Sequence, residues 1–282
     1  MREPDARTSS EPTVQGKVTP MADLNTWFNN GAAYEDAMGQ WSRLVGEIFL
    51  TWLAPERGLR WIDVGCGNGA FTALLMQHCA PAEAYGIDLS EAQIAFARSR
   101  PDAAGAIFQL GDAMALPFGD GRFDAASMAL AISFLPDPAR GIAEMARVVR
   151  PGGNVATYMW DGTNGGSPFH PIQTEMREHG IALPTPPSAD ASRMDALRAL
   201  WTDARFEAVE TREVTVQRTF PDFETFWSVS TRMGRIQPAL AALSPDDITR
   251  LKERVRMRIP ADAEGRITYA ARANAIKGRV PG

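Results

Sequence analysis

Between residues 59 and 160 the chain alternates short apolar runs with amphipathic stretches, and this alternation constrains the fold more than any other feature. The runs are almost continuously apolar, which is typical of strands whose two faces are both covered. Most of them are followed by residues with helical spacing, as in the β–α units of a parallel sheet. We therefore predict a doubly wound α/β fold with helices on both faces. The predicted strands are 60–64, 84–89, 106–110, 123–130 and 154–160.

Local signals set the limits of the helices between these strands. One helix is expected over residues 70–78. Ser90 is a good N-cap for a second helix, which we expect to run to about residue 100. Asp137 precedes Pro138, which suits the first helical position, and the run Pro151-Gly152-Gly153 breaks the helix that they open.

The chain divides into four predicted parts. Residues 1–20 contain three prolines and no apolar periodicity, so we expect a disordered leader. Residues 21–58 have helical spacing and should form an N-terminal helical cap. Residues 59–160 form the predicted core, which carries the ligand site. Residues 161–282 are expected to hold the remainder of the sheet together with helical insertions that cover the substrate.

The last part is expected to complete a seven-stranded, mostly parallel sheet. Residues 209–220 and 266–278 alternate as strands, and we predict that they pair antiparallel at one edge of the sheet. A helix over residues 243–259, opened by Ser244, separates them along the chain. Ser192 is expected to cap another helix, which runs to about residue 201.

Composition and charge exclude several classes of protein. Lysine and arginine number 29 and aspartate and glutamate 34, so the net charge of −5 lacks the electrostatic footprint of a nucleic-acid binder. Hydrophobic residues make up 45%, enough for a large core, yet the longest apolar stretch, 125–135, is too short to span a bilayer. Cys66 and Cys79 suit neither a disulfide framework nor a zinc site. We therefore expect no metal and a reducing, cytoplasmic compartment, and the first twenty residues do not resemble a secretory signal.

A glycine-rich turn, Asp63-Val64-Gly65-Cys66-Gly67-Asn68-Gly69-Ala70, follows the first predicted strand. Glycines here let the backbone turn sharply and approach a ligand at the carboxyl edge of the sheet. The spacing also fits the dinucleotide fingerprint, so an NAD(P)-dependent oxidoreductase is one alternative. The carboxylate of Asp63 would repel a pyrophosphate but suits a cationic ligand. Asp88 and Asp112 follow the next two strands, where they can bind ribose hydroxyls and an adenine amino group.

Five segments occur in order along this part of the chain. They are WIDVGCGNGAF (61–71), GIDLS (86–90), GDAMALPF (111–118), FDAASMAL (123–130) and LPDPARGIAEMARVVRPGG (135–153). Together they resemble the class I S-adenosylmethionine-dependent methyltransferases, in particular the small-molecule "type 11" group that includes the ubiquinone and menaquinone biosynthesis type. The resemblance implies a Rossmann-like methyltransferase fold, S-adenosyl-L-methionine as the cofactor and a small-molecule methyl acceptor.

The resemblance assigns the methionine end of the cofactor to the glycine-rich turn. Gly65, Gly67 and Gly69 would line the methionine moiety, and Asp63 would lie near its ammonium group. In related chains a segment that precedes the domain closes over the cofactor. Arg43, in such a segment here, would then pair with the methionine carboxylate.

The nucleoside end and the sulfonium are assigned to the following strand ends. Asp88 would hold the ribose hydroxyls, and Leu89 would pack on the adenine. Asp112 would accept the adenine amino group, with a backbone N–H of Ala113 beside it. Met128, at the end of the fourth strand, would border the sulfonium.

The sequence shows no obvious catalytic base. Many members of the group carry a histidine near the position of Ser133-Phe134, and this chain has none there. His170, in the loop region after the fifth strand, is a weak candidate for a base or else a partly exposed loop histidine. Trp160 and Asp161 end that strand and either contact substrate or, for Asp161, cap the strand end. The candidates for an apolar acceptor pocket, which also suit a protein core, are Trp27, Phe28, Tyr34, Trp41, Phe223, Phe226 and Trp227.

These features favour a methyltransferase that transfers a methyl group from S-adenosylmethionine to a small molecule by direct displacement. The oxidoreductase alternative lacks a Tyr-x-x-x-Lys pair, since none of the four tyrosines has a lysine four residues on. A third alternative is a non-catalytic module that keeps the fold and binds S-adenosylmethionine. We expect no nucleic-acid partner and no membrane span, and the sequence leaves the acceptor and the oligomeric state open.

Overall fold

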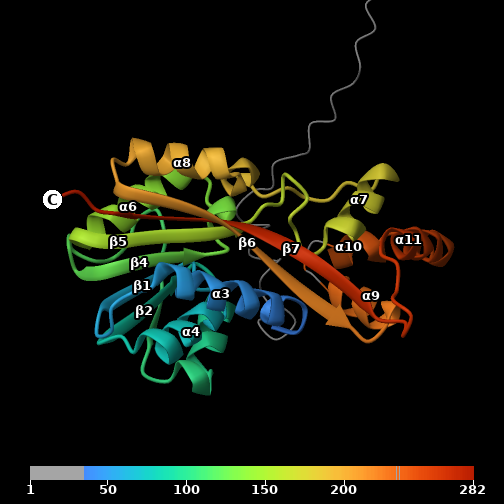
Figure 1. Ribbon diagram of the computed structural model, residues 1–282, viewed down its shortest axis with the longest axis horizontal. Helices are drawn as coiled ribbons and strands as arrows, with labels where there is room; N and C mark the ends of the chain where they lie inside the picture. Colours follow the sequence, from blue (N-terminus) through green and yellow to red (C-terminus); the bar gives the residue numbers. More distant parts are fainter. Residues whose placement is uncertain (1–34, 233, 235) are drawn as a thin grey trace, which may run out of the picture.

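The computed structural model describes residues 35–232, 234 and 236–282. The predicted leader and the first part of the predicted cap, with Trp27, Phe28 and Tyr34, lie outside these residues. The described chain is built around one seven-stranded sheet, so the predicted mostly parallel α/β fold is confirmed (Figure 1). The order of strands across the sheet is β3-β2-β1-β4-β5-β7-β6.

The seven strands occupy positions close to those predicted. They are β1 (Arg60–Val64), β2 (Glu83–Asp88), β3 (Ile107–Leu110), β4 (Phe123–Ala129), β5 (Val149–Trp160), β6 (Glu207–Phe220) and β7 (Ile267–Arg279). Strands β1 to β5 are parallel, whereas β7 runs antiparallel to both β5 and β6. The chain order reverses at β1, which lies between β2 and β4. In open α/β sheets a ligand crevice forms beyond the carboxyl ends of the strands at such a point.

Helices cover both faces of the sheet. On one face lie α3 (Gln40–Leu53), α4 (Ala70–Cys79) and α5 (Glu91–Arg98), and on the other α6 (Pro138–Val148) and α8 (Met194–Asp203). Because side chains alternate along a strand, Trp61 of β1 packs with α3 and α4, whereas Ile62 packs with α6 and α8. Figure 1 shows α3 and α4 below the sheet and α6 and α8 above it.

Four short helices complete the body of the molecule. They are the π-helix η1 (Glu35–Gly39) and the 3-10 helices η2 (Pro101–Ala103), η3 (Ile132–Phe134) and η4 (Ala189–Ser192). The helices α7 (His170–Glu178), α9 (Phe223–Ser230), α10 (Ile236–Ala241) and α11 (Pro245–Arg258) lie together at one end, beside the far part of the β6–β7 pair (Figure 1). Helices α9 to α11 are inserted between β6 and β7, as the sequence predicts.

Three of the predicted helix starts are confirmed by their capping hydrogen bonds. The side chains of Ser90, Asp137 and Ser244 accept the backbone N–H groups of Gln93, Arg140 and Asp247, respectively. The cap predicted at Ser192 is wrong. Its hydroxyl donates to the carbonyl of Ala189 inside η4, and α8 begins two residues later without a side-chain cap.

The expected break at residues 151–153 is also placed differently. Helix α6 ends at Val148 and β5 begins at once, with Val149 paired to Phe123 of β4. The register then shifts, and pairing resumes between Asn154 and Ala125. Residues 151–153 therefore form an irregularity within a long strand instead of a loop that precedes it.

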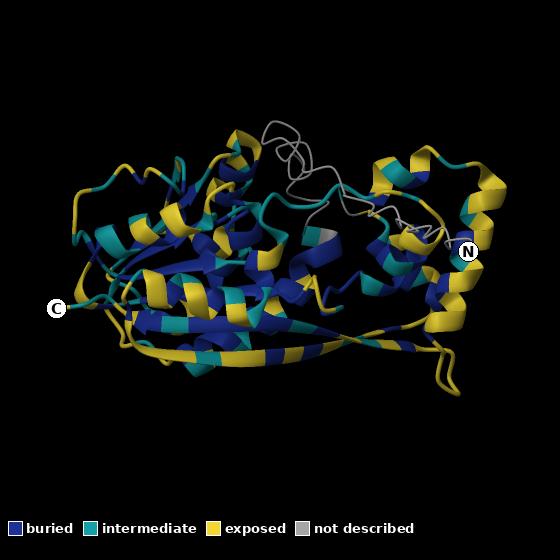
Figure 2. Ribbon diagram, turned by 90° about the horizontal axis from the view of Figure 1, so that it is seen from above, coloured by how far each residue is buried: buried dark blue, intermediate teal, exposed yellow. Residues whose placement is uncertain are grey.

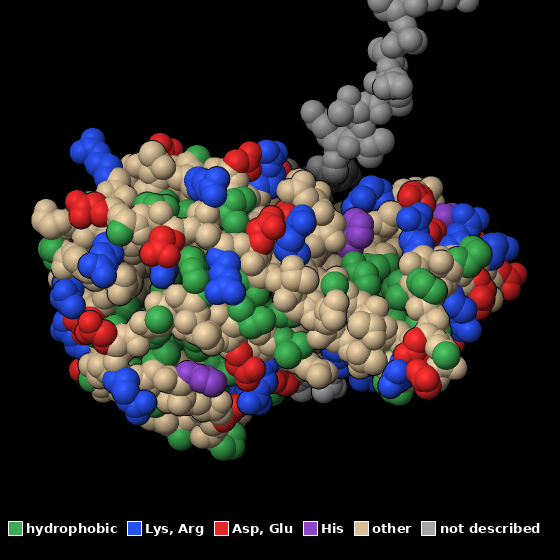
Figure 3. Space-filling model, in the orientation of Figure 1, with side chains coloured by type: hydrophobic (Ala, Val, Ile, Leu, Met, Phe, Trp, Pro, Cys, Tyr) green, Lys and Arg blue, Asp and Glu red, His purple; other side chains and the backbone are tan. Residues whose placement is uncertain are grey.

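The described aromatic candidates belong to the protein core. Trp41, Phe223, Phe226 and Trp227 are buried, and the Trp41 ring packs on Trp160 with 6.5 Å between ring centroids. Figure 2 shows the buried residues concentrated in the strands and on the inner faces of the helices. Charged side chains of both signs are interspersed over the face shown in Figure 3. No helix among the described residues is both long and apolar enough to cross a membrane.

Two glycines with nearly the same backbone conformation allow the packing of α4 to be tested. Gly58 and Gly69 have φ values of +78° and +80°, respectively. A Cβ atom at Gly58 would meet nothing within 4 Å, whereas one at Gly69 would lie 3.0 Å from Ala97 Cβ and 3.1 Å from Phe108 Cζ. Gly69 therefore lets the start of α4 pack closely against α5 and β3.

We expect Gly58→Ala to lower the free energy of unfolding by about 1 kcal/mol, because the left-handed backbone alone opposes the methyl group. Gly69→Ala should lower it by roughly 1–3 kcal/mol more, since the methyl group also presses on Ala97 and Phe108. Urea denaturation of both variants beside the parent protein measures the difference. Equal losses would show that the contact at Gly69 does not limit the packing of α4.

Candidate functional site

A cavity of about 800 Å³ opens at the carboxyl edge of the sheet, where the chain order reverses. This volume lies within the range of roughly 300–1,000 Å³ that small-molecule sites occupy. One half of the cavity is formed by the glycine-rich turn and the ends of β2, β3 and β4. The other half is formed by the end of β5, by α7 and by the proline-rich segment 181–186.

Tight backbone contacts shape the glycine-rich turn in the first half. The N–H groups of Gly65 and Cys66 both donate to the carbonyl of Ile87, at 2.7 and 2.9 Å. Gly65 has a φ of +72°, and a Cβ atom there would lie 2.6 Å from the Cβ of Ala131. A side chain at this position is therefore excluded both by the backbone conformation and by the close approach of the β4 loop.

Asp88 ends β2 and faces the cavity beside this turn. One carboxylate oxygen accepts the N–H of Gly67 and the other the N–H of Ser90, both at 2.9 Å. Burial raises the pKa of Asp88, and the backbone hydrogen bonds oppose this shift. The carboxylate is thus fixed in direction at the edge of the cavity.

The end of β3 adds a second aspartate to the same cavity. Asp112 lines the wall, and its carboxylate accepts the N–H of Met114 at 2.8 Å. Ala113, which lies between Asp112 and Met114 in the sequence, also lines the wall. Leu89 also lines the cavity and is 44% exposed.

The structure brings six of the predicted cofactor residues to this cavity and leaves four away from its wall. The six are Gly65, Gly67, Asp88, Leu89, Asp112 and Ala113. The four that do not line it are Arg43, Asp63, Gly69 and Met128. Each of these four has a separate physical reason for its position.

Asp63 is fully buried beneath the turn instead of facing the cavity. Its carboxylate accepts the hydroxyl of Thr72 at 2.7 Å. Burial, the largest cause, and the nearby charge of Asp88 raise its pKa to about 7. Its place is therefore in the core below the glycine-rich turn.

Gly69 and Met128 both lie against packed parts of the core instead of the cavity. Gly69 faces α5 and β3, as described above. The Met128 side chain belongs to the core cluster under α6, because β4 sends alternate residues to opposite faces. At this place the cavity is lined by Ala129, which ends β4, and by the two residues after it, Leu130 and Ala131. Leu130 has a φ of +57°, which turns the chain over the opening and which the sequence did not signal.

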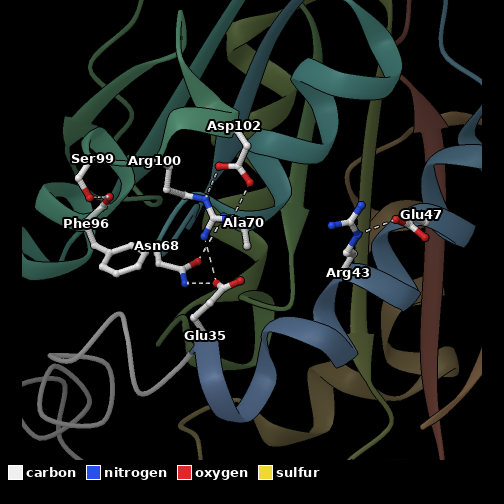
Figure 4. A network of polar contacts seen from close by, with 9 residues as sticks. All are labelled: Glu35, Arg43, Glu47, Asn68, Ala70, Phe96, Ser99, Arg100 and Asp102. Carbon is white, nitrogen blue, oxygen red and sulfur yellow. Dashed lines mark hydrogen bonds and ion pairs between the residues drawn. The ribbon is translucent and has the colours of Figure 1, made fainter.

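Arg43 and the base candidate His170 also lie outside the wall formed by the described residues. The side chain of Arg43 is 65% exposed and pairs with Glu47 on the outer face of α3, whereas its neighbour Ser42 lines the cavity (Figure 4). His170 begins α7, where burial, the largest cause, and the charge of Arg177 lower its pKa. It contacts Thr174 instead of the cavity.

Of the two residues at the end of β5, Trp160 lines the cavity and Asp161 does not. The carboxylate of Asp161 is buried and accepts hydrogen bonds from Asn164 at 3.0 Å and Arg272 at 2.7 Å. Asp161 therefore fixes the strand end. Among the part of the chain that the structure describes, no group of three or more metal-ligating side chains is close enough to hold an ion.

A polar network closes the cavity on the side of the glycine-rich turn (Figure 4). Asn68 lines the cavity and donates to the carboxylate of Glu35, the first residue of η1, at 2.8 Å. The same carboxylate pairs with Arg100 at 3.0 Å, and Arg100 pairs with Asp102 at 2.9 Å. The network thereby joins η1 and the residues after α5 to the turn.

Comparison with known proteins agrees with this geometry. Residues 62–157 match the family model described as "Methyltransferase domain". These residues form a methyltransferase domain. The domain holds β1 to β4, most of β5 and the turn that shapes the cavity.

Two curated relatives and one solved structure illustrate the likeness. The ubiquinone/menaquinone biosynthesis C-methyltransferase of Roseobacter denitrificans is 36% identical over 117 residues, 40% of this chain and 47% of the relative. The malonyl-[acyl-carrier protein] O-methyltransferase of Methylococcus capsulatus is 36% identical over 149 residues, 49% and 54% of the two chains. The chain thus spans about half the length of these relatives. The phosphoethanolamine N-methyltransferase 2 of Haemonchus contortus, solved with S-adenosyl-L-methionine, shares the fold at 18% identity and a TM-score of 0.57, over 94% of this chain and 61% of that one.

The buried carboxyl group of Asp63 gives stability a pH dependence that can be measured. Its pKa rises from the ordinary value of 3.8 to about 7 in the folded protein. The native state therefore keeps a proton that the unfolded chain has already lost, so the free energy of unfolding falls as the pH rises from about 4 to 7. The full difference corresponds to about 4 kcal/mol.

We expect Asp63→Asn to remove this dependence. The melting temperature of the variant relative to the parent should increase between pH 5 and pH 8, because the amide carries no charge to desolvate. Asp203→Asn, at the exposed end of α8, is the matched control and should show no such trend. Parallel melting curves for Asp63→Asn and the parent would mean that Asp63 is ionised in the native protein throughout this range.

Proposed function

We propose that this chain is a methyltransferase that uses S-adenosyl-L-methionine and transfers its methyl group to a small molecule. One observation carries the proposal. Within a matched methyltransferase domain, the glycine-rich turn, Asp88 and Asp112 converge on one cavity at the carboxyl edge of the sheet. The cavity is large enough for a cofactor and a small acceptor together.

The residues of the first half of the cavity fit this cofactor. At Gly67, with a φ of +53°, a Cβ atom would meet no protein atom within 4 Å, so the glycine leaves open space where a ligand can lie against the backbone. Asp88 would accept the ribose hydroxyls, as carboxylates at this place in the fold do. Asp112 and the N–H of Ala113 would receive the adenine, and Leu89 would cover the ring.

We assign the methionine end of the cofactor to a smaller set of residues than the sequence predicts. Arg43 lies on the outer face of α3 and is not assigned a role at the cofactor. Asn68 and Gly65 lie in the cavity wall instead, and Asp63 is buried and accepts the hydroxyl of Thr72. We assign the binding of the methionine moiety to the turn itself.

S-Adenosylmethionine supplies a methyl group on a positively charged sulfur, which leaves as a neutral thioether. The protein then has to hold both reactants in line and to keep water away. Ala129, Leu130 and the ring of Tyr158 line the cavity and serve this purpose. Binding and orientation of the two reactants are the contributions that we assign to the residues of the wall.

The sheet order argues against the dinucleotide alternative. The dinucleotide-binding fold has parallel strands in the order 3-2-1-4-5-6. Here the antiparallel β7 lies between β5 and β6. The names of the relatives include methyltransferases of a quinone, of malonyl-[acyl-carrier protein] and of fatty acids, which supports a small acceptor with an apolar part.

Thermal unfolding with S-adenosylhomocysteine, S-adenosylmethionine, NAD and NADP tests the cofactor. At 100 times its dissociation constant a ligand stabilises the native state by about 2.7 kcal/mol, which should raise the melting temperature by roughly 5–10 °C. We expect this shift with the two sulfur compounds only. A shift with NAD or NADP instead, or none with the sulfur compounds, would contradict the proposal.

We expect Asp88→Asn to weaken S-adenosylhomocysteine binding by about tenfold to a hundredfold, because hydrogen bonds to a charged group contribute about 1.5–3 kcal/mol. Titration calorimetry measures this loss, and Asp203→Asn, far from the cavity, should bind as the parent does. Unchanged binding in Asp88→Asn would remove the ribose role. Formation of S-adenosylhomocysteine with any acceptor separates an enzyme from a module that only binds the cofactor.

A further inference from the structure

Helix α7 presents one row of side chains to the second half of the cavity. Phe169 at its N-cap, Gln173 and Arg177 are spaced by four residues, so they lie along one face of the helix. All three line the cavity. The row carries an aromatic ring, an amide and a guanidinium group, in that order. Phe169 and Gln173 are buried, whereas Arg177 is exposed and lies at the open end of the cavity.

The charge of Arg177 is not neutralised by the protein. No hydrogen bond or ion pair engages its guanidinium within the described ranges, 35–232, 234 and 236–282. The two carboxylates of the same helix, Glu175 and Glu178, are both bound by Arg258 of α11. These ion pairs hold the far side of α7 and leave Arg177 free to meet a ligand.

The immediate electrostatic surroundings of Arg177 add positive charge. Arg177 and Arg258 both lower the pKa of His170, which places the two guanidinium groups near the same imidazole. In the second half of the cavity the wall includes one carboxylate, that of Asp190, which is exposed. Arg193 lies near it, since Asp195, with which Arg193 pairs, and then Asp190 raise the pKa of Arg193. Among the described residues no ion pair joins Asp190 to Arg177, so the charge of Arg177 is not neutralised by this carboxylate.

Two buried donors near this row also lack partners. The side-chain Nε2 of Gln173 and the indole Nε1 of Trp160 are buried and make no hydrogen bond to any described residue. Both residues line the cavity. Unpaired buried donors are costly, and native proteins usually keep them where a ligand or water completes the bond. An indole N–H and a guanidinium can only donate, so they require an acceptor atom such as an oxygen.

The remainder of this half is apolar. Phe134, Leu135, Ile181 and Leu183 line it together with the prolines of the segment 181–186. The neighbouring Ser188 ties that segment to the β4 loop, since its N–H and its hydroxyl donate to the carbonyls of Ser133 and Leu135 at 3.1 and 2.8 Å. The second half therefore offers an apolar compartment with one cationic end.

We infer that the methyl acceptor is an organic acid with an apolar body, whose carboxylate is bound by Arg177 at the open end of the cavity. A single guanidinium matches a carboxylate in charge and in its two-pronged geometry. Gln173 and Trp160 supply further donors to oxygen atoms of the same molecule. The inference deepens the proposed function and rests on it, and it makes Arg177 a specificity-determining residue, not a catalytic one.

Three probes of equal shape and different charge test this inference. They are 4-phenylbutanoate, 4-phenylbutan-1-ol and 4-phenylbutylamine, titrated by calorimetry into the full chain saturated with S-adenosylhomocysteine. We expect the acid to bind about tenfold more tightly than the alcohol and the amine to bind most weakly. The preference for the acid should shrink as salt is raised, because Arg177 is exposed.

Variants of two arginines locate the effect. Arg177→Gln should bind the acid about tenfold more weakly and the alcohol unchanged, and Arg177→Lys should recover part of the loss. Arg254→Gln on α11 is the matched control, since Arg254 is also an exposed helical arginine but does not line the cavity. It should leave the affinity for all three probes unchanged.

The outcomes separate this inference from the function on which it rests. If the chain binds S-adenosylhomocysteine but prefers the alcohol or the amine, or if both arginine variants behave alike, the inference is wrong and the methyltransferase proposal stands. If the chain does not bind S-adenosylhomocysteine, both are wrong. Selective loss of acid binding in Arg177→Gln, with cofactor binding intact, supports the inference.

Discussion

The structure depends on how the chain leaves β1, a strand that is buried on both faces at the centre of the sheet. After Val64 the backbone has to turn into α4 while β2, β3, the loop after β4 and the end of α5 approach closely from several sides. At Gly65 the contact with Ala131 leaves no room for a methyl group, and at Gly69 the approach of Ala97 and Phe108 makes one unfavourable. Both positions also have a positive φ, so the turn favours glycine at these places.

The same constraint creates the ligand site. The N–H groups of Gly65 and Cys66 donate to the carbonyl of Ile87 and that of Gly67 donates to Asp88, which binds the turn to the end of β2. The result is a wall made largely of backbone, with the Asp88 carboxylate fixed beside it. Asp63 lies in the core, where one oxygen of its carboxyl group accepts the hydroxyl of Thr72 and where burial raises its pKa to about 7.

The two halves of the cavity come from different parts of the chain and carry different chemistry. The strand ends supply carboxylates, which suit hydroxyl and amino groups. Helix α7 supplies an amide and a guanidinium, and its orientation depends on the ion pairs of Arg258 with Glu175 and Glu178. In the proposed function the matched domain would hold the cofactor, and α7 with the segment 181–186 would face the acceptor.

By itself, the sequence determined the strands, the capped helices and the glycine-rich turn, because periodicity, caps and glycine spacing are local properties of the chain. It also indicated Asp88 and Asp112, since residues that end parallel strands meet at one edge of the sheet.

Only the tertiary structure decided which neighbouring residues face the cavity. Met128 and Asp63 point into the core, and Arg43 points to solvent beside a cavity-lining Ser42. Neighbouring side chains on a strand or helix point in different directions, so an error of one residue decides whether a side chain is placed in the cavity or away from it. Which face meets the cavity is set by packing against elements that are distant in the sequence. For the same reason Arg177 became recognisable only when α7, β5 and the segment 181–186 were seen around one cavity.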